Sequence, residues 1–250
     1  MDNKYLIEVC CAHLQSGIEA QEGGALRIEL CDNLYEGGTT PSYATIKKAK
    51  EKLNIDINVM IRPRGSDFCY SDDEFEIMKE DIRICKKLGV YGVAFGILLN
   101  DGNVDVARSR QLVQIAKPLS ITFHRAFDMS PDPFKAIEKI IGLGINRILT
   151  AGQKNTAPEG LDLISQLVKK AAGRIIIMPG SGINEENIQE IRDKSGATEF
   201  HLTGKKPVES KMQFRKQGIF MGGLKEIPEY SINITDAVRI RKIINLLNKQ

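Results

Sequence analysis

Short apolar runs alternate with amphipathic segments along the whole chain, at spacings of roughly 20 to 35 residues. The apolar runs have the length of buried strands, and the amphipathic segments have the period of helices that cover a sheet. Eight strands are predicted, near Tyr5–Cys10, Leu26–Cys31, Ile57–Ile61, Tyr91–Phe95, Leu119–Phe123, Asn146–Thr150, Ile175–Met178 and Thr198–Leu202. Eight helices are predicted to follow them, near Gln15–Glu22, Tyr43–Leu53, Asp73–Leu88, Val104–Ala116, Pro133–Ile141, Gly160–Ala171, Glu185–Lys194 and Thr235–Asn248.

Eight strand-helix pairs in 250 residues predict an α/β protein, a single-domain TIM-type (β/α)8 barrel over residues 1–250. The periodicity leaves an open doubly wound sheet as the alternative. The stretch from Gly204 to Ile234 interrupts the rhythm as a long insertion between strand 8 and the last helix. Because it is long and partly apolar, we expect it to form a lid or a subunit contact, which makes a homo-oligomer the expected assembly.

The composition narrows the classes of function. The net charge is only +3 and no basic run is present, which argues against nucleic acid as a partner. No apolar run approaches the roughly 20 residues of a membrane span, so no membrane association is expected. The five cysteines, with no secretory signal before them, are typical of reduced thiols, and a cytoplasmic location is expected.

Several strands end abruptly in polar or small residues. The run ending at Phe123 continues into His124-Arg125, the run ending at Ile61 into Arg62-Pro63-Arg64, and the run ending at Met178 into Pro179-Gly180-Ser181-Gly182. In a (β/α)8 barrel, the carboxyl ends of all strands meet at one face, where the active site lies. These strand ends therefore predict one shared site.

The first two strands carry matching tripeptides, Glu8-Val9-Cys10 and Glu29-Leu30-Cys31. Glu and Cys are two residues apart and share a face, and we place that face inside the barrel because the opposite face packs against helices. Cys10 and Cys31 are then neighbours across one strand spacing. Two facing thiolates suit Cu(I), permit a reversible disulfide, or simply fill space as small apolar groups.

The carboxylates Glu8 and Glu29 would raise each other's pKa unless a cation lies between them, and Arg62 is the expected cation. His124 and His201 are expected to face the same cavity. This set of five residues predicts acid-base catalysis on a small phosphorylated or carboxylated metabolite. The alternative is a structural polar network that plugs the barrel mouth.

Two loops are candidates for binding an anion. Gly180-Ser181-Gly182 precedes a helix, and Thr203-Gly204 follows the eighth strand, which is where phosphate sites of barrels often lie. Arg64, in the loop after the third strand, is a further candidate, because an arginine fork recognises carboxylates and phosphates. An Arg/Asp-bonded loop that only rigidifies the rim is the alternative.

Long motifs resemble the CutC family of copper homeostasis proteins. They are Glu8-Val9-Cys10, Arg27-Ile28-Glu29-Leu30-Cys31, Glu36-Gly37-Gly38-Thr39-Thr40-Pro41-Ser42, Ile61-Arg62-Pro63-Arg64-Gly65, Asp67-Phe68-Cys69-Tyr70-Ser71-Asp72, Thr122-Phe123-His124-Arg125-Ala126-Phe127-Asp128-Met129 and Arg147-Ile148-Leu149-Thr150. The resemblance implies a TIM-type barrel and a cytoplasmic protein that binds Cu(I) through Cys10 and Cys31, with no organic cofactor. It implies no particular enzymatic reaction, so the acid-base enzyme stays the rival hypothesis, with an interaction protein held by the long insertion as a third.

Overall fold

A computed structural model gives the structure of the protein and describes residues 5–222 and 224–249. At its centre, eight parallel strands follow the order β7-β6-β5-β4-β3-β2-β1-β8, and a parallel bridge between Gly180 and His201 joins the two ends of this sheet. The strands are β1 (Leu6–Cys11), β2 (Arg27–Leu30), β3 (Asp56–Met60), β4 (Gly92–Phe95), β5 (Ser120–Phe123), β6 (Arg147–Thr150), β7 (Ile176–Pro179) and β8 (Glu199–Leu202). The predicted (β/α)8 barrel is confirmed, and the open sheet is excluded because the sheet closes on itself.

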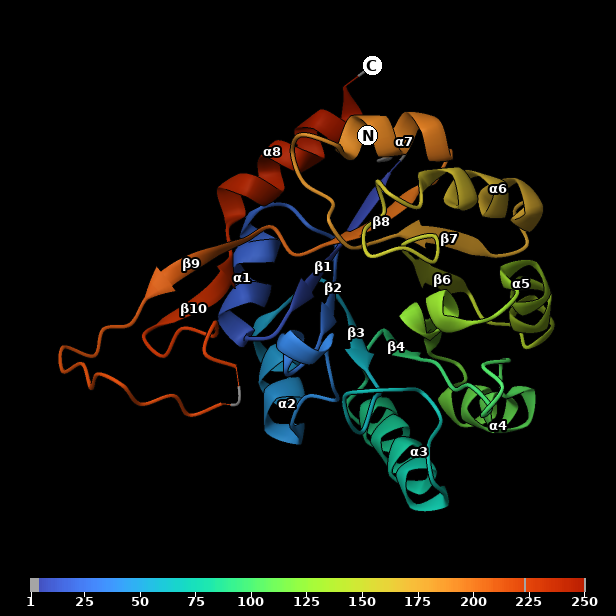
Figure 1. The fold of residues 1–250 in the computed structure, drawn as a ribbon, viewed down its shortest axis with the longest axis horizontal. Helices are drawn as coiled ribbons and strands as arrows, with labels where there is room; N and C mark the ends of the chain where they lie inside the picture. Colours follow the sequence, from blue (N-terminus) through green and yellow to red (C-terminus); the bar gives the residue numbers. More distant parts are fainter. Residues whose placement is uncertain (1–4, 223, 250) are drawn as a thin grey trace.

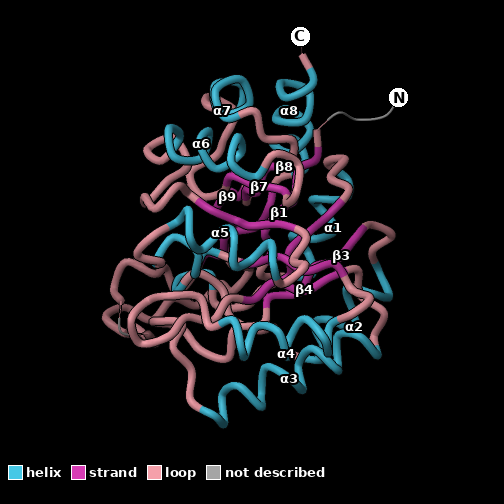
Figure 2. The backbone as a smooth tube through the Cα atoms, turned by 90° about the vertical axis from the view of Figure 1, so that its right-hand side faces the viewer, coloured by secondary structure: helices cyan, strands magenta, loops and turns pink. Residues whose placement is uncertain are grey.

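Helices surround the strands on all sides (Figures 1 and 2). They are α1 (Leu14–Glu22), α2 (Tyr43–Lys52), α3 (Asp72–Lys87), α4 (Val106–Ala116), α5 (Pro133–Gly142), α6 (Leu161–Ala171), α7 (Ile188–Ser195) and α8 (Ala237–Asn248). Within the described ranges, no helix is long and apolar enough to cross a membrane.

Local sequence signals set the helix boundaries. Helix α3 begins at a capping box in which the Ser71 hydroxyl accepts from the Glu74 amide and the Glu74 carboxylate accepts from the Ser71 amide. Helix α7 begins at Ile188, later than the predicted Glu185, because the preceding turn is held by a hydrogen bond from the Asn184 amide to Asn187 Oδ1.

The two faces of each strand belong to different cores. Val9 and Leu30 lie in the large apolar core between the strands and the helices. Cys10, Cys31 and Met60 form a separate cluster inside the barrel. Alternation along the strands produces this separation, and it leaves the barrel interior with charged side chains that the outer apolar core lacks.

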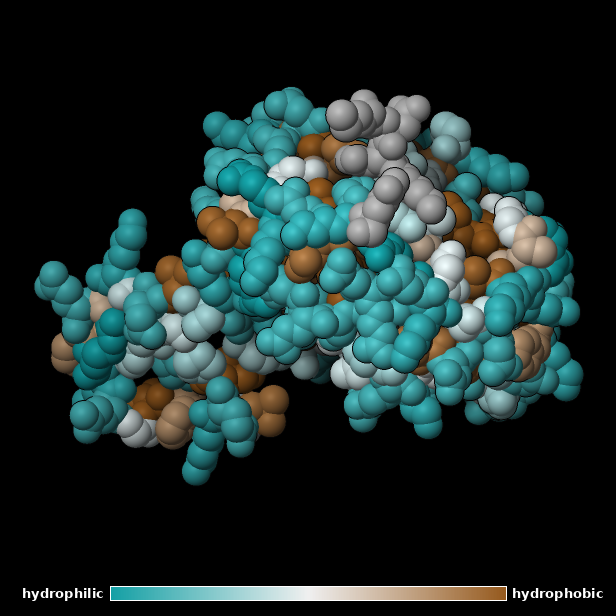
Figure 3. Space-filling view, turned by 90° about the horizontal axis from the view of Figure 1, so that it is seen from above, coloured by the Kyte–Doolittle hydropathy of each residue, from teal (hydrophilic) through white to brown (hydrophobic). Residues whose placement is uncertain are grey.

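The insertion after β8 contains a structure that the sequence analysis did not predict. Strands β9 (Lys205–Glu209) and β10 (Ser231–Thr235) pair antiparallel and begin an arm that projects from the barrel (Figure 1). The strands lie far apart in the chain, so no short hairpin turn marks them. The arm exposes large apolar side chains (Figure 3), including Met212, Phe214, Ile219, Phe220, Met221 and Leu224. Its role as a lid or a subunit contact stays a prediction.

Candidate functional site

A network of paired charges fills the base of the barrel. Arg27 Nε donates to Glu8 Oε2 at 2.6 Å, and Asn58 Nδ2 donates to the same oxygen at 2.7 Å. Arg27 also binds Glu199, to which Arg147 Nε donates at 3.0 Å. Glu8, Arg27 and Arg147 are buried and the Glu199 side chain is only 12% exposed, so each charge is stabilised mainly by a partner rather than by water.

The prediction that Arg62 is the cation serving Glu8 and Glu29 is wrong. Arg27 takes that position beside Glu8, because it lies on β2 two residues before Glu29 and faces inward with it. Arg62 lies just past the end of β3, and its guanidinium turns to the rim, where Nη1 donates to the carbonyls of Glu36 and Gly38 at 2.6 and 2.9 Å.

His201 connects the base of the barrel to its mouth. Its Nδ1 lies 2.9 Å from Glu8 Oε1, and its Nε2 lies 3.7 Å from Glu29 Oε2. Burial opposes a charge on this ring, but its contacts with Cys10 and the two glutamates raise its pKa well above the usual value. Burial also opposes a charge on Glu8, yet Arg27 and His201 hold the pKa of Glu8 well below its usual range. His201 is therefore a buried cation among acidic groups.

Two thiols and a carboxyl group meet above His201. Cys10 Sγ and Cys31 Sγ lie 3.5 Å apart, and both approach Glu29 Oε2, at 3.8 and 3.4 Å. These three residues form a group whose ligand atoms are close enough to share one metal ion. The sulfur separation is far longer than the roughly 2.05 Å of a disulfide, so both cysteines are free thiols.

The thiol pair is electrostatically asymmetric. The hydrogen bond with Cys31 lowers the pKa of Cys10 to about 5, with a further contribution from His201. The same hydrogen bond, together with burial, raises the pKa of Cys31 well above its ordinary value. Burial also raises the pKa of Glu29 to about 8. The lowered pKa favours the thiolate of Cys10 at neutral pH, and thiolate is the form that binds metal.

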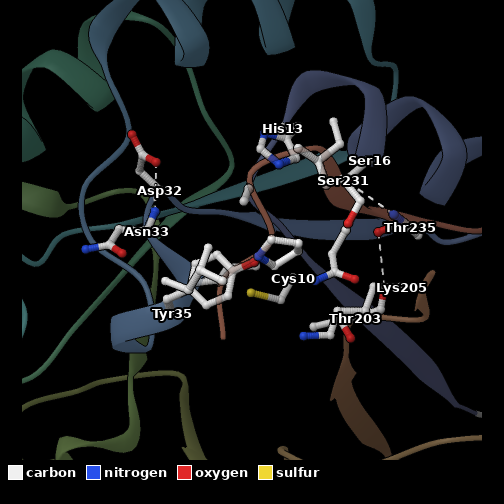
Figure 4. Close-up of a pocket in the computed structure, with 16 residues that line it drawn as sticks. Cys10, His13, Ser16, Asp32, Asn33, Tyr35, Thr203, Lys205, Ser231 and Thr235 are labelled. Carbon is white, nitrogen blue, oxygen red and sulfur yellow. Dashed lines mark hydrogen bonds between the residues drawn. The ribbon is translucent and has the colours of Figure 1, made fainter. Parts of the chain in front are cut away.

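Cys10 lies at the junction of two cavities. The larger, about 620 Å³, occupies the barrel mouth and is also lined by Glu29, Arg62, His124 and His201. The smaller, about 260 Å³, lies between the barrel and the base of the arm (Figure 4). In Figure 4, the Cys10 sulfur is drawn between Tyr35 and Thr203, and His13 lies across the cavity from it. The thiolate is thus buried but borders two open spaces.

The predicted anion-binding residues divide into two groups. Ser181, Gly182 and Thr203 line the larger cavity, and Gly180 pairs with His201 beneath it.

Gly204 and Arg64 lie elsewhere. A Cβ at Gly204 would lie 2.5 Å from Ile240, so this residue packs against α8. The Arg64 guanidinium binds Glu74 and Asp67, at 2.6 and 3.0 Å. Arg64 is therefore paired within the rim loop, and its role in binding an anion stays a prediction.

Sequence reasoning missed Arg27, Arg147 and Met60, all of which face the barrel interior. Arg27 and Arg147 are the cations of the base network, and Met60 packs against Cys10 and Cys31. The inward alternation that selected Glu29 also selects Arg27, and Met60 lies two residues before Arg62. The alternation that marks these residues as inward-facing was present in the sequence, but charged residues at the start of a strand are usually taken for its solvent-exposed end.

Comparisons with known proteins agree with these motifs. The sequence profile of the CutC family matches residues 5–206. The chain is 50% identical to the family protein CutC of Parabacteroides distasonis, over 96% of this chain and all of that protein. It is 47% identical to the copper homeostasis protein cutC homolog of Homo sapiens, over 96% of this chain and 88% of that protein.

Solved structures give the same assignment. The CutC protein of Streptococcus agalactiae superposes with a TM-score of 0.77 at 39% identity, covering 80% of this chain and 98% of that one. Phosphoribosylanthranilate isomerase of Thermotoga maritima superposes with a TM-score of 0.57 at 12% identity, covering 97% and 98%, and shares only the barrel fold. The chain belongs to the CutC family.

Proposed function

We propose that this protein is a cytoplasmic copper homeostasis protein that binds Cu(I) through Cys10 and Cys31. The observation that carries the proposal is the pair of buried thiols 3.5 Å apart, one of which has its pKa lowered to about 5. Two relatives that are 47% identical to this chain are named copper homeostasis proteins. The ion is the cargo of the protein in this proposal, and no chemical conversion of it is needed.

The donor set fits a soft monovalent ion better than zinc or a hard cation. Thiolates and thioethers select Cu(I), whereas structural zinc sites use four ligands in a tetrahedron. The group of potential ligands found among the described residues supplies two sulfurs and one carboxyl oxygen. Met60 adds a thioether side chain that packs against both thiols. A reducing compartment such as the cytoplasm would keep the thiols in the form that binds.

Position and charge also favour exchange of an ion. Cys10 borders both cavities, so an ion reaches the thiolate without opening the barrel core. His201 contributes positive charge beneath the sulfurs and helps to stabilise the thiolate. Cys31 is almost completely buried, at 1% exposure, which keeps the second sulfur shielded from bulk solvent.

An anaerobic titration of Cu(I) against a competing chelator tests the proposal. We expect Cys10→Ser/Cys31→Ser to lose the tight binding of wild type, because hydroxyl oxygen is a poor ligand for a soft ion. Cys69→Ser is the matched control, since Cys69 is an exposed thiol in the rim loop. Wild-type affinity in the double variant, or an equal loss in Cys69→Ser, would refute the assignment of Cys10 and Cys31.

Met60→Leu refines the test. Leucine keeps the apolar contact with the two thiols but removes the thioether, so a loss of Cu(I) affinity in this variant would identify Met60 as a third ligand. Unchanged affinity would restrict the site to the two thiolates.

A further inference from the structure

The cavity at the barrel mouth is larger than a copper site requires. Its volume of about 620 Å³ falls within the range of pockets for small organic molecules, roughly 300 to 1,000 Å³. Of the two cysteines, Cys10 lines this cavity. The remaining wall combines apolar side chains with polar groups from the ends of other strands, including Arg62 and His124.

His124 lines this cavity and holds a buried hydrogen-bond donor that its described neighbours leave unused. Its Nδ1 accepts a hydrogen bond from the Ala126 amide at 3.2 Å, so in the neutral ring the proton lies on Nε2. Nε2 is at the opposite edge of the ring, and it has no hydrogen-bond partner among residues 5–222 and 224–249. The side chain is 2% exposed. Burial and the nearby Arg62 charge lower the pKa of His124 to about 3, so the ring stays neutral and Nε2 stays a donor at physiological pH.

Arg62 supplies a second donor of the same kind. Three carbonyl oxygens hold its terminal nitrogens, those of Glu36, Gly38 and Ser66. Its Nε is buried and makes no hydrogen bond within the described part of the chain, although the buried Tyr70 hydroxyl lies close to the guanidinium. The guanidinium is therefore fixed in place with one N–H and its positive charge left over.

Phe68 joins the two donors into one unit. The Arg62 guanidinium carbon lies 5.0 Å from the centre of the Phe68 ring, and the His124 ring centre lies 5.1 Å from it. Phe68 lines the same cavity. The arrangement holds both side chains against one aromatic ring and limits the freedom of either to find a partner elsewhere.

None of the three acidic side chains on the cavity wall serves these donors, and Glu29 Oε1 has no partner among the described residues. Asp128 accepts from Arg125 Nε at 2.7 Å and from the backbone amides of Ala151 and Gln153. Glu36 accepts from the Asn33 side chain. Two donors, one of them cationic, thus share a wall on which Asp128 and Glu36 are already engaged and burial raises the pKa of Glu29 to about 8. Buried polar atoms without partners are rare in folded proteins, and the missing partner here has to be an acceptor.

We propose that this cavity binds a small organic oxyanion, a carboxylate or a phosphate, whose oxygens accept hydrogen bonds from His124 Nε2 and Arg62 Nε. The site is separate from the thiol pair and does not depend on copper binding. Its location at the carboxyl ends of the strands is the usual place for a ligand in this fold. Ser181, Gly182 and Thr203 lie on the same cavity wall and provide small polar surface for the rest of the ligand.

Calorimetric titration of the reduced, metal-free full chain with malonate and with inorganic phosphate tests the proposal, with glycerol as the uncharged control. We expect saturable binding of one of the two anions and none of glycerol. Malonate binding identifies a carboxylate ligand, and phosphate binding identifies a phosphorylated one. Failure of both anions to bind at millimolar concentration overturns the proposal.

Two substitutions at His124 separate the donor from the structural contact. In His124→Asn, the side-chain oxygen replaces Nδ1 as the acceptor for the Ala126 amide, but the Nε2 donor is lost. In His124→Gln, the amide nitrogen reaches the position of Nε2 and keeps a donor. We expect roughly tenfold or weaker anion binding in His124→Asn, as for loss of one hydrogen bond to a charged group, and near wild-type binding in His124→Gln.

The remaining outcomes are also decisive. Equal affinity in His124→Asn and wild type would place the anion elsewhere, for example at Lys205, and would overturn the proposal. Cys10→Ser/Cys31→Ser should bind the anion as wild type does. If that variant lost anion binding while His124→Asn kept it, the anion would be assigned to the thiol pair instead. Failure of the copper proposal and failure of this one are therefore distinguishable.

Discussion

The base and the mouth of the barrel contain similar residues in opposite states. At the base, Arg27, Arg147, Glu8 and Glu199 are all paired. At the mouth, Glu29, Arg62 and His124 each retain a buried polar atom without a partner among the described residues. Paired buried charges specify a structure, whereas unpaired ones reduce stability and are retained where a ligand supplies the missing contact. This difference supports a structural role for the base and agrees with the binding proposed for the mouth.

Arg27→Met should cause the largest loss of stability, because it leaves Glu8 and Glu199 with one cation fewer inside the barrel. Removal of one partner from a buried ion pair typically costs about 3–5 kcal/mol, and we expect a loss of that size in urea unfolding. Arg27→Met/Glu8→Gln removes one of the two carboxylates and should recover part of the loss. A loss below ~1 kcal/mol for Arg27→Met would show that the base network is not essential to folding.

At the mouth, Glu29→Gln should increase the stability of the protein rather than decrease it. Burial raises the pKa of Glu29 from 4.5 to about 8, so between these values the folded protein keeps a proton that the unfolded chain has lost. Stability of wild type therefore falls as the pH rises through this window, and the neutral glutamine is free of that loss. We expect the stability advantage of Glu29→Gln over wild type to grow as the pH rises from 4.5 to 8 and to stay constant above pH 8. The advantage at the plateau should be up to ~5 kcal/mol.

Urea unfolding of both chains with a chelator present, at several pH values, measures this difference. A stability difference that does not change with pH would mean that Glu29 is ionised in the folded protein. The same variant keeps Cys10 and Cys31, so its Cu(I) affinity shows whether the Glu29 carboxyl group is a ligand of the ion.

Arg174→Ala should have the smallest effect and serves as the surface reference. Arg174 forms a two-pronged ion pair with Glu138, at 2.8 Å for both contacts, but the two side chains are 44% and 41% exposed. Water replaces such contacts readily, so we expect no resolvable change in the urea midpoint. A loss comparable to that of Arg27→Met would show that burial does not explain the difference between the buried and exposed pairs.

Much of the site was predictable because alternation along a strand depends on the sequence alone. It placed Glu8, Cys10, Glu29 and Cys31 inside the barrel and brought the two cysteines together. The same rule could have identified Arg27 and Met60. It failed at Arg62, which lies in a loop after β3, where no fixed period determines which way a side chain points.

The arm also could not be predicted from local sequence patterns. β9 and β10 pair across a long separation, so neither the pairing nor the projection of the arm follows from a local turn signal. The predicted insertion was located correctly, but its strands appeared only in the folded structure.

The sequence by itself determined the eight strand-helix units, the inward face of each strand and the presence of two cysteines on that face. These follow from periods of two and 3.6 residues, which are properties of the local backbone. Only the tertiary structure decided which charges found partners. Arg27 rather than Arg62 neutralises Glu8, Cys10 rather than Cys31 becomes the thiolate, and His124 keeps its free donor, because burial and distance between strands set pKa values and hydrogen bonds.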